Sequence, residues 1–135
     1  MKLLKSKRIK IALVMMMFVL GAGFMFTGST STKAGAKQVQ YLGKYKLTAY
    51  CGCKGCSGGW GNRTASGKKA KAGRTIAVDK KKIKLGTKVK IQGKTYVAED
   101  VGGGVKGKHI DIYFTSHKKV QRFGRKNNIK VYKIK

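Results

Sequence analysis

Apolar and polar residues alternate along much of the chain after residue 40, which is the pattern of strands that bury one face. The clearest case is 109–114, in which Ile110, Ile112 and Phe114 share one face and Asp111 points to the other. Alternation, or enrichment in β-forming residues, predicts six strands, at 41–50, 75–78, 88–92, 95–98, 109–114 and 129–134. Six short strands in one small domain predict a compact β-barrel.

The segments between these strands depend on glycine for their turns, because the chain has 19 glycines and no proline. Gly93-Lys94 predicts a two-residue hairpin turn between neighbouring strands. Residues 116–126 predict one short helix, with Ser116 or Thr115 as its cap. Residues 51–71 predict a long loop that holds all three cysteines and the only tryptophan. The expected fold is therefore mainly β, with one short helix.

The first 36 residues differ from the rest and predict a signal peptide. Five bases lie in the first ten positions, an uncharged apolar run follows at 11–26, and a small-residue motif ends at Ala36. The apolar run of 16 residues is shorter than the roughly 20 needed to cross a bilayer. Cleavage after Ala36 is therefore favoured over a retained membrane anchor. We expect 37–135 to form one exported domain, associated with the cell wall, or membrane-anchored if the segment stays uncleaved.

Positive charge dominates the composition: the 135 residues include 32 Lys and Arg against four acids, a formal net charge of +28. Six of the bases precede residue 37, which leaves +22 on the predicted domain. Such a charge attracts polyanions. Nucleic acid is the usual inference, but an exported chain is expected to meet anionic wall polymers or lipid headgroups instead. At this length the chain is expected to be a single-domain monomer.

The four acidic residues cluster in one part of the sequence, at Asp79, Glu99, Asp100 and Asp111. Asp111 is flanked on the polar face of its predicted strand by His109 and Tyr113, a position suited to an acid that contacts a sugar. Asp100 comes just before the glycine run 102–104, where a ligand can approach the backbone closely. A single Asp at a strand end commonly caps a turn. Because all four acidic residues lie in this one stretch, they together indicate a candidate site.

Several motifs in fixed order resemble the three-aspartate, or 3D, domain family. They are Arg74-Thr-Ile-Ala-Val-Asp79, Ile83-Lys-Leu-Gly-Thr87, Ala98-Glu-Asp100-Val-Gly-Gly-Gly-Val-Lys-Gly107 and Ile110-Asp111-Ile-Tyr-Phe114. Leu47-Thr-Ala-Tyr-Cys51, Thr64-Ala-Ser-Gly67 and Phe123-Gly-Arg125 fit as well, so the resemblance covers nearly all of 45–135. The chain departs from the family at Lys80 and Lys84, where proline is common; these positions concern turn rigidity.

The resemblance implies a double-psi β-barrel, similar to the catalytic barrel of membrane-bound lytic murein transglycosylase A and to the expansin barrel. It also implies peptidoglycan cleavage between N-acetylmuramic acid and N-acetylglucosamine, with a 1,6-anhydro end as product. The family's acid/base falls on Asp111, while Asp100 and Asp79 line the same groove. We expect Asp111 to be the acid/base, Asp100 its electrostatic partner and Asp79 a supporting residue. Burial and Asp100 would have to raise the pKa of Asp111.

The expected substrate contacts are Thr48, Gly102, Gly103, Lys106 and Tyr113. Trp60 and Tyr113 either stack on sugar rings or serve as packing residues. No cofactor is predicted, and the expected partner is the glycan strand of peptidoglycan. Two alternatives stay open: a non-catalytic, expansin-like binder of wall polysaccharide, and a basic polyanion-binding protein without an active site.

Cys51, Cys53 and Cys56 make an odd number of cysteines for an exported chain. An oxidising exterior favours one disulfide and one free thiol. Zinc would need a fourth ligand, His109 or His117, and no metal is predicted. A Cys–His nucleophile pair is conceivable in chemical terms, but no flanking motif supports it.

Overall fold

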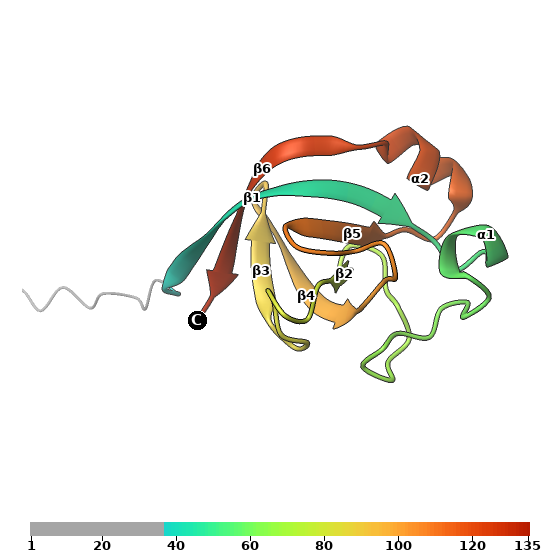
Figure 1. Ribbon diagram of the computed structural model, residues 1–135, viewed down its shortest axis with the longest axis horizontal. Coiled ribbons are helices and arrows are strands. Elements are labelled where there is room, and N and C mark those ends of the chain that lie inside the picture. Colours follow the sequence, from blue (N-terminus) through green and yellow to red (C-terminus); the bar gives the residue numbers. More distant parts are fainter. Residues whose placement is uncertain (1–36) are drawn as a thin grey trace, which may run out of the picture. The chain divides into compact units, whose positions relative to one another are not determined.

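The computed structural model describes residues 37–135, and the signal segment predicted at 1–36 lies outside this range. The six strands are β1 (Val39–Tyr50), β2 (Thr75–Val78), β3 (Lys88–Ile91), β4 (Lys94–Asp100), β5 (His109–Tyr113) and β6 (Lys126–Ile134). The two helices are α1 (Lys54–Ser57) and α2 (His117–Phe123) (Figure 1). The prediction of a mainly β domain with six strands is confirmed. Within 37–135, no helix combines the length and apolar character needed to span a membrane.

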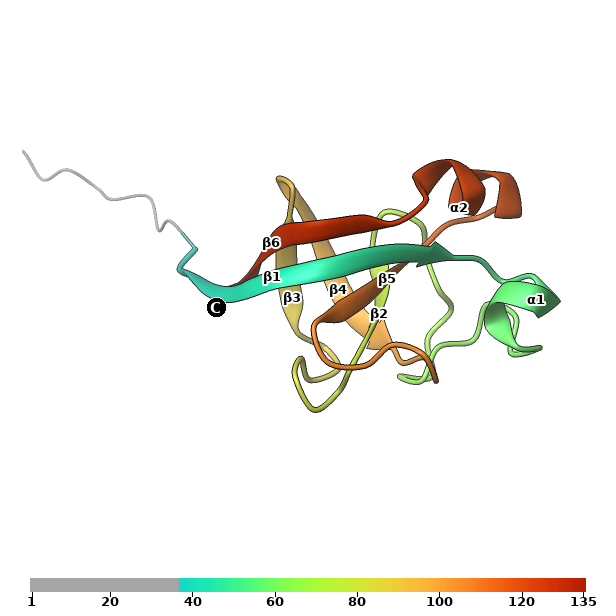
Figure 2. The ribbon, with the colours of Figure 1, turned by 45° about the horizontal axis from the view of Figure 1, so that its top comes forward.

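The strands close into a barrel in the order β1-β5-β2-β4-β3-β6. Two of the neighbouring pairs are parallel, β1 with β5 and β2 with β4, and the other four are antiparallel. The long strands β1 and β6 run side by side along one edge (Figure 2). Lys135 donates its backbone N–H to the carbonyl of Gln38 at 2.9 Å, so the described segment begins and ends at the same side of the barrel.

The barrel interior is filled by the apolar faces that the alternation predicts. Ile110 and Ile112 of β5 are buried, as are Val89 and Ile91 of β3, and Phe114 packs against the same cluster. The largest fully buried side chains in this cluster come from five of the strands: Leu47, Ile76, Val78, Val89, Ile91, Ile110 and Val131. A second, smaller cluster includes Tyr50 at the end of β1, Ala77 of β2 and Tyr113 at the end of β5. It packs beneath the candidate site.

Three local features differ from the predictions. The hairpin turn is formed by Gln92 and Gly93, with φ angles of 48° and 81°, and not by Gly93-Lys94. This is the left-handed pair that a type I′ turn requires, and it leaves Lys94 paired with Ile91 in the ladder. The loop after β1 contains the unpredicted helix α1. Helix α2 is shorter than 116–126; Ser116 occupies its N-cap position without a side-chain capping hydrogen bond.

Candidate active site

A row of four side chains crosses four neighbouring strands on one face of the barrel wall. Thr48 of β1 pairs with Asp111 of β5, and Asp111 pairs with Ala77 of β2. Ala77 in turn pairs with Asp100 of β4. Residues directly opposite in a ladder point to the same face, so the two aspartates flank the small side chain of Ala77. Adjacent strands lie about 4.8 Å apart, which sets the two aspartate backbones about 10 Å from each other.

A one-residue irregularity brings Asp100 into this row. In the β2–β4 ladder, Ile76 pairs with Ala98 and the next pair is Ala77 with Asp100, so Glu99 is skipped. Such a bulge turns the following side chain to a new direction. Glu99 points to a buried site instead, where it accepts hydrogen bonds from Arg74 and from Thr75. Without the bulge, Glu99 would take the place of Asp100 opposite Ala77.

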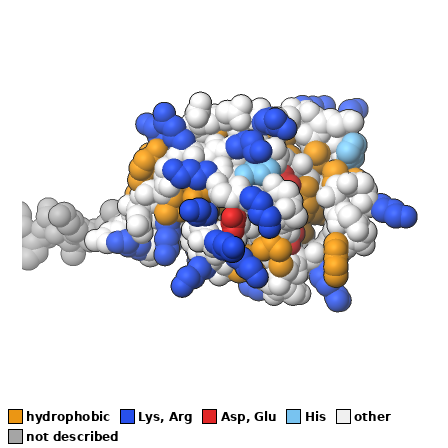
Figure 3. All heavy atoms as spheres, viewed as in Figure 1, with side chains coloured by type: hydrophobic (Ala, Val, Ile, Leu, Met, Phe, Trp, Pro, Cys, Tyr) orange, Lys and Arg blue, Asp and Glu red, His pale blue; other side chains and the backbone are white. Residues whose placement is uncertain are grey.

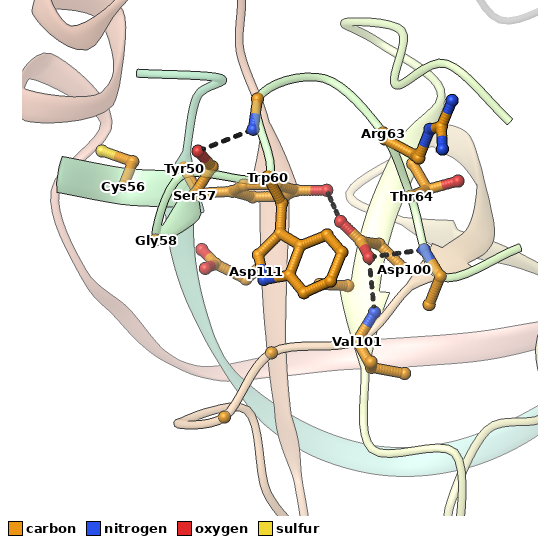
Figure 4. A pocket seen from close by; sticks show the side chains of 15 residues that line it. Tyr50, Cys56, Ser57, Gly58, Trp60, Arg63, Thr64, Asp100, Val101 and Asp111 are labelled. Carbon is orange, nitrogen blue, oxygen red and sulfur yellow. Dashed lines mark hydrogen bonds between the residues drawn. The ribbon is translucent and has the colours of Figure 1, made fainter. Parts of the chain in front are cut away.

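Three members of the row, Asp111, Ala77 and Asp100, line the floor of a groove of about 710 Å³. The loop after β1 supplies one wall and the glycines after β4 the other (Figure 4). Trp60 lines this groove with 76% of its surface exposed, a large apolar face open to solvent. The principal lining residues are Tyr50, Ser57, Trp60, Ala77, Asp100, Gly102, Gly103 and Asp111. The groove is thus open, polar at its floor and bordered by an exposed aromatic ring.

Asp111 combines burial with a hydrogen-bonded environment. The hydroxyl of Thr48 donates to Asp111 Oδ1 at 2.7 Å. Burial raises the pKa of the Asp111 carboxyl above its usual range, and the nearby charge of Asp100 raises it further. The Thr48 hydrogen bond and the charge of His109 act in the opposite direction, but the net pKa is raised. A carboxyl group with a raised pKa can hold a proton for delivery to a substrate.

The hydrogen bonds around Asp111 continue to His109. The Oγ1 of Thr48 lies 2.8 Å from His109 Nε2, and His109 Nδ1 lies 3.1 Å from the carbonyl of Gly104. A carbonyl only accepts, so Nδ1 carries a proton. If Asp111 is ionised, Thr48 donates to it and accepts from a doubly protonated His109. If Asp111 is protonated, it donates to Thr48, which donates to a neutral His109. The two states contain the same number of protons and differ by two transfers, of one proton from Thr48 to Asp111 and of one from His109 Nε2 to Thr48.

Asp100 has a different environment, made of donors. Its Oδ2 accepts the phenol proton of Tyr50 at 2.7 Å. Its Oδ1 accepts the backbone N–H groups of Ala65 and Val101, each at 2.9 Å (Figure 4). Burial and the hydrogen bond to Asp100 raise the pKa of Tyr50, so the phenol remains a donor. Three donors suit a carboxylate anion, which only accepts.

The substrate contacts expected from the sequence fall in different places. Gly102 and Gly103 line the groove, and Thr48 holds Asp111. A Cβ atom at Gly102 would meet Val105 Cγ2 at 2.7 Å, so a side chain there would force Val105 to shift. Tyr113 is buried, packs edge-on to Tyr50 and donates its hydroxyl to Asn62. Of the two roles considered for Tyr113, the structure gives it packing.

Asp79 and Lys106 lie outside the groove lining. Asp79 accepts backbone N–H groups from Gly107 at 2.8 Å and from Lys81 at 2.9 Å. These bonds, from Gly107 first, lower the pKa of Asp79. Lys106 is exposed and contributes a favourable charge to Asp79. In this arrangement Asp79 joins the end of β2 to the glycine loop before β5.

Sequence reasoning missed several residues that build the site. Tyr50 was noted only as a strand residue, yet it holds Asp100, and Ala77 was not singled out although it separates the two carboxyl groups. Their positions follow from the order of strands around the barrel, which no local pattern reveals. The short side chain of Ala77 in an otherwise bulky strand, Thr-Ile-Ala-Val, is the one available signal. The three cysteines, expected to include a disulfide, are free thiols.

Comparison with known proteins finds a family match in part of the chain. The 3D domain family model matches residues 74–135, which confirms the resemblance predicted from the sequence. The stretch 45–73, where the resemblance was extended upstream, lies outside this match. The Bacillus subtilis (strain 168) protein YabE, whose name describes a role in cell wall shaping, is 40% identical over 84 residues. That alignment covers 58% of this chain but only 20% of YabE, so the chain spans about a fifth of the relative's length.

Among the solved structures that match part of this chain are crystal structures of MltA from Escherichia coli. One MltA crystal structure is 28% identical, with a TM-score of 0.46, over 54% of this chain and 27% of that one. A second, of MltA with bound chitohexaose, is 26% identical with a TM-score of 0.45, over 53% and 27% of the respective chains.

Proposed function

Since residues 74–135 match the 3D domain, we propose that this chain is a cell-wall lytic transglycosylase that acts on peptidoglycan glycan strands. It would cut the bond between N-acetylmuramic acid and N-acetylglucosamine and leave a 1,6-anhydro end. The observation that carries this proposal is the half-buried Asp111, with its raised pKa, on the floor of an open groove beside Asp100. The name of YabE points to the same compartment. In this proposal 1–36 is the export signal and 37–135 the catalytic domain.

The proposed reaction needs one acid/base. Protonated Asp111 donates its proton to the glycosidic oxygen as the bond from that oxygen to the sugar's anomeric carbon breaks. The 6-hydroxyl oxygen of the same sugar then bonds to the anomeric carbon and gives its proton back to Asp111. Asp111 thus acts as acid and then as base, and is protonated again at the end. The raised pKa of Asp111 supports the first step, because the acid must begin protonated.

Asp100 would stabilise the positive charge that develops on the sugar ring between these steps. The three donors that hold it fix its orientation, so no reorganisation is needed as the charge forms. Ala77 leaves the space between Asp100 and Asp111 open for the sugar. The relay from His109 through Thr48 would hold the returning proton close to Asp111.

The remaining proposed roles concern the substrate and the fold. Trp60 would stack on a sugar ring at the edge of the groove, and Gly102 and Gly103 would let the glycan approach the backbone. Asp79 would support the site by fixing the loop before β5. The two parallel strand pairs, β1 with β5 and β2 with β4, fit the double-psi type of barrel that the family resemblance implies.

Digestion of purified peptidoglycan, followed by mass spectrometry of the products, tests the proposal. We expect anhydro-muropeptides from the wild-type chain and a loss of at least about 100-fold in Asp111→Asn. Asp111→Asn keeps the shape of the side chain, and Lys88→Gln, an exposed change on β3, is the control that should retain activity. Products with ordinary reducing ends would indicate hydrolysis instead. Binding without new chain ends would indicate an expansin-like binder and would contradict the proposal.

A further inference from the structure

Four metal-binding side chains meet beside the groove, although they come from distant parts of the sequence. Cys51 follows β1, Cys53 and Cys56 belong to the turn of α1, and His117 is the first residue of α2. Their sulfur and nitrogen atoms all lie within 4.8 Å of one another. The other histidine, His109, is engaged with Thr48 and Gly104.

The distances from His117 Nδ1 to Cys53 and Cys56 are close to those of a tetrahedral metal site, whereas the Cys51–Cys53 sulfur distance is shorter. Cys51 Sγ and Cys53 Sγ are 3.2 Å apart, and His117 Nδ1 is 3.8 Å from Cys53 Sγ and 3.4 Å from Cys56 Sγ. With Zn–S bonds of about 2.3 Å and Zn–N bonds of about 2.0 Å, the ligands of a tetrahedral Zn²⁺ lie about 3.5–3.8 Å from each other. Three sulfurs with one imidazole nitrogen form a known structural zinc set, and Cys53-Lys-Gly-Cys56 has the two-residue spacing typical of one.

Among the described residues, this cluster supplies the side-chain hydrogen bonds between the loop after β1 and helix α2. The segment between β1 and β2 spans residues 51–74 and contains only the single turn of α1. Neither α1 nor α2 has a buried residue. The later part of this loop is anchored to the barrel by the buried Ala70 and by the hydrogen bond from Ala65 to Asp100, whereas α1 itself has no buried residue. The cysteine–histidine cluster is where this loop and α2 contact each other through side chains.

We propose that Cys51, Cys53, Cys56 and His117 bind one structural Zn²⁺. Zn²⁺ replaces the three thiol protons and takes the free electron pair of His117 Nδ1, so three protons are released on binding. All four positions are taken by protein, which leaves no open site for catalysis. The metal would fix the wall of the groove, because Cys56, Ser57 and Gly58 line it.

A disulfide is the competing use of these cysteines. Any single disulfide would leave the third thiol unpaired and His117 without a role, whereas zinc uses all four groups. Cys51 is 2% exposed and ends a core strand, while Cys53 is exposed at the helix start. Zinc therefore ties the buried end of β1 to two surface segments. This inference is independent of the proposed glycan chemistry and concerns the stability of the loop.

Metal analysis of the full chain, purified without chelator and under reducing conditions, tests the proposal. We expect one zinc per chain, and, after exchange with Co²⁺, the intense visible absorption of tetrahedral cobalt–thiolate coordination. His117→Ala should lower zinc affinity by about 10- to 100-fold or more. His117 is exposed, so its loss should leave the barrel folded, which circular dichroism would verify. His109→Ala is the matched control. His109 is the other of the chain's two histidines and lies outside the cluster, so this variant should keep one zinc per chain.

Two outcomes would overturn the site. One is a chain that takes up no zinc or cobalt after complete reduction and anaerobic reconstitution. The other is an unchanged zinc affinity in His117→Ala. A native chain that is 2 Da lighter than its reduced form by mass spectrometry, with no zinc, would show that a disulfide takes the place of the metal. Because these readouts do not involve glycan, they are separate from any failure of the proposed enzyme activity.

Discussion

Thr48 is the residue through which the strand pairing acts on the chemistry of Asp111. Its hydroxyl lies between the carboxyl group and His109, and it is held there by parallel pairing of β1 with β5. The hydroxyl can donate to Asp111 or to His109, so protonation of one of these groups changes the hydrogen bond made to the other. Loss of the Thr48 hydroxyl should therefore affect catalysis although Thr48 itself does not contact the sugar.

Thr48→Val replaces the hydroxyl by a methyl group of similar size and separates Asp111 from His109. We expect kcat/KM for glycan cleavage to fall by about 10- to 100-fold. The hydrogen bond lost is one that lowers the pKa of Asp111, so that pKa should rise further. The alkaline limb of the pH–rate profile should then move to higher pH. Thr48→Ser retains the hydroxyl and should keep the wild-type profile; a wild-type profile in Thr48→Val would exclude the relay.

The sequence predicts single residues well where a local pattern decides their direction. The alternation in 109–114 places Ile110 and Ile112 in the core and Asp111 on the opposite face, and the structure agrees. The contact of Thr48 with Asp111 crosses 63 positions, and no periodicity reveals which strands are neighbours. His117 as the fourth member of the cysteine cluster was one of two alternatives for the same reason. A local pattern therefore predicts which face of a strand a residue occupies, whereas the order of strands around the barrel determines which residues it contacts.

At the level of elements, the bulge between β2 and β4 separates two adjacent acids into different roles. Asp100 faces the groove, whereas Glu99 is 2% exposed and is held by Arg74 at 2.7 Å and Thr75 at 2.7 Å. The sequence alone does not distinguish the role of Glu99 from that of Asp100, because adjacent strand residues reveal their faces only when the ladder is regular. Because of the bulge, the side chains of these two successive acids point in different directions, and each is held by hydrogen bonds of its own.

Glu99 should make folding of the barrel sensitive to acid. Burial alone would raise its pKa, but the hydrogen bonds from Arg74 and Thr75 outweigh burial and lower the pKa from the usual 4.5. An acid with a lowered native pKa contributes stability that is full above its unfolded pKa and is lost as pH falls through the native pKa. We expect the free energy of unfolding in urea to drop below pH 4.5.

Glu99→Gln should flatten this pH dependence and lower the stability at neutral pH, measured by circular dichroism across a urea series. Asp79→Asn is a useful companion, since the pKa of Asp79 is also lowered, through a different pair of backbone donors. Its effect should add to that of Glu99→Gln, because the two acids have no contact in common. A wild-type pH dependence in Glu99→Gln would contradict the ion-pair interpretation.

On the scale of the whole molecule, positive charge far exceeds negative charge. Lys and Arg side chains are spread over the face seen in Figure 3, and acidic atoms appear there in only a few places. With +22 on residues 37–135, the domain should be drawn to an anionic surface from any direction. This attraction comes from charges spread over the domain, so binding to the surface can be measured separately from catalysis by Asp111.

Binding to purified cell walls should therefore depend on salt and not on the catalytic acid. Exposed charges are screened beyond about 10 Å at 0.1 M salt and about 3 Å at 1 M, so co-sedimentation with walls should fall severalfold across this range. Asp111→Asn should bind as the wild-type chain does, while its cleavage activity is lost. Walls stripped of anionic polymers should bind less at low salt and show a weaker salt dependence. Equal, salt-independent binding to native and stripped walls would instead mean that the groove provides the affinity and that the distributed charge does not.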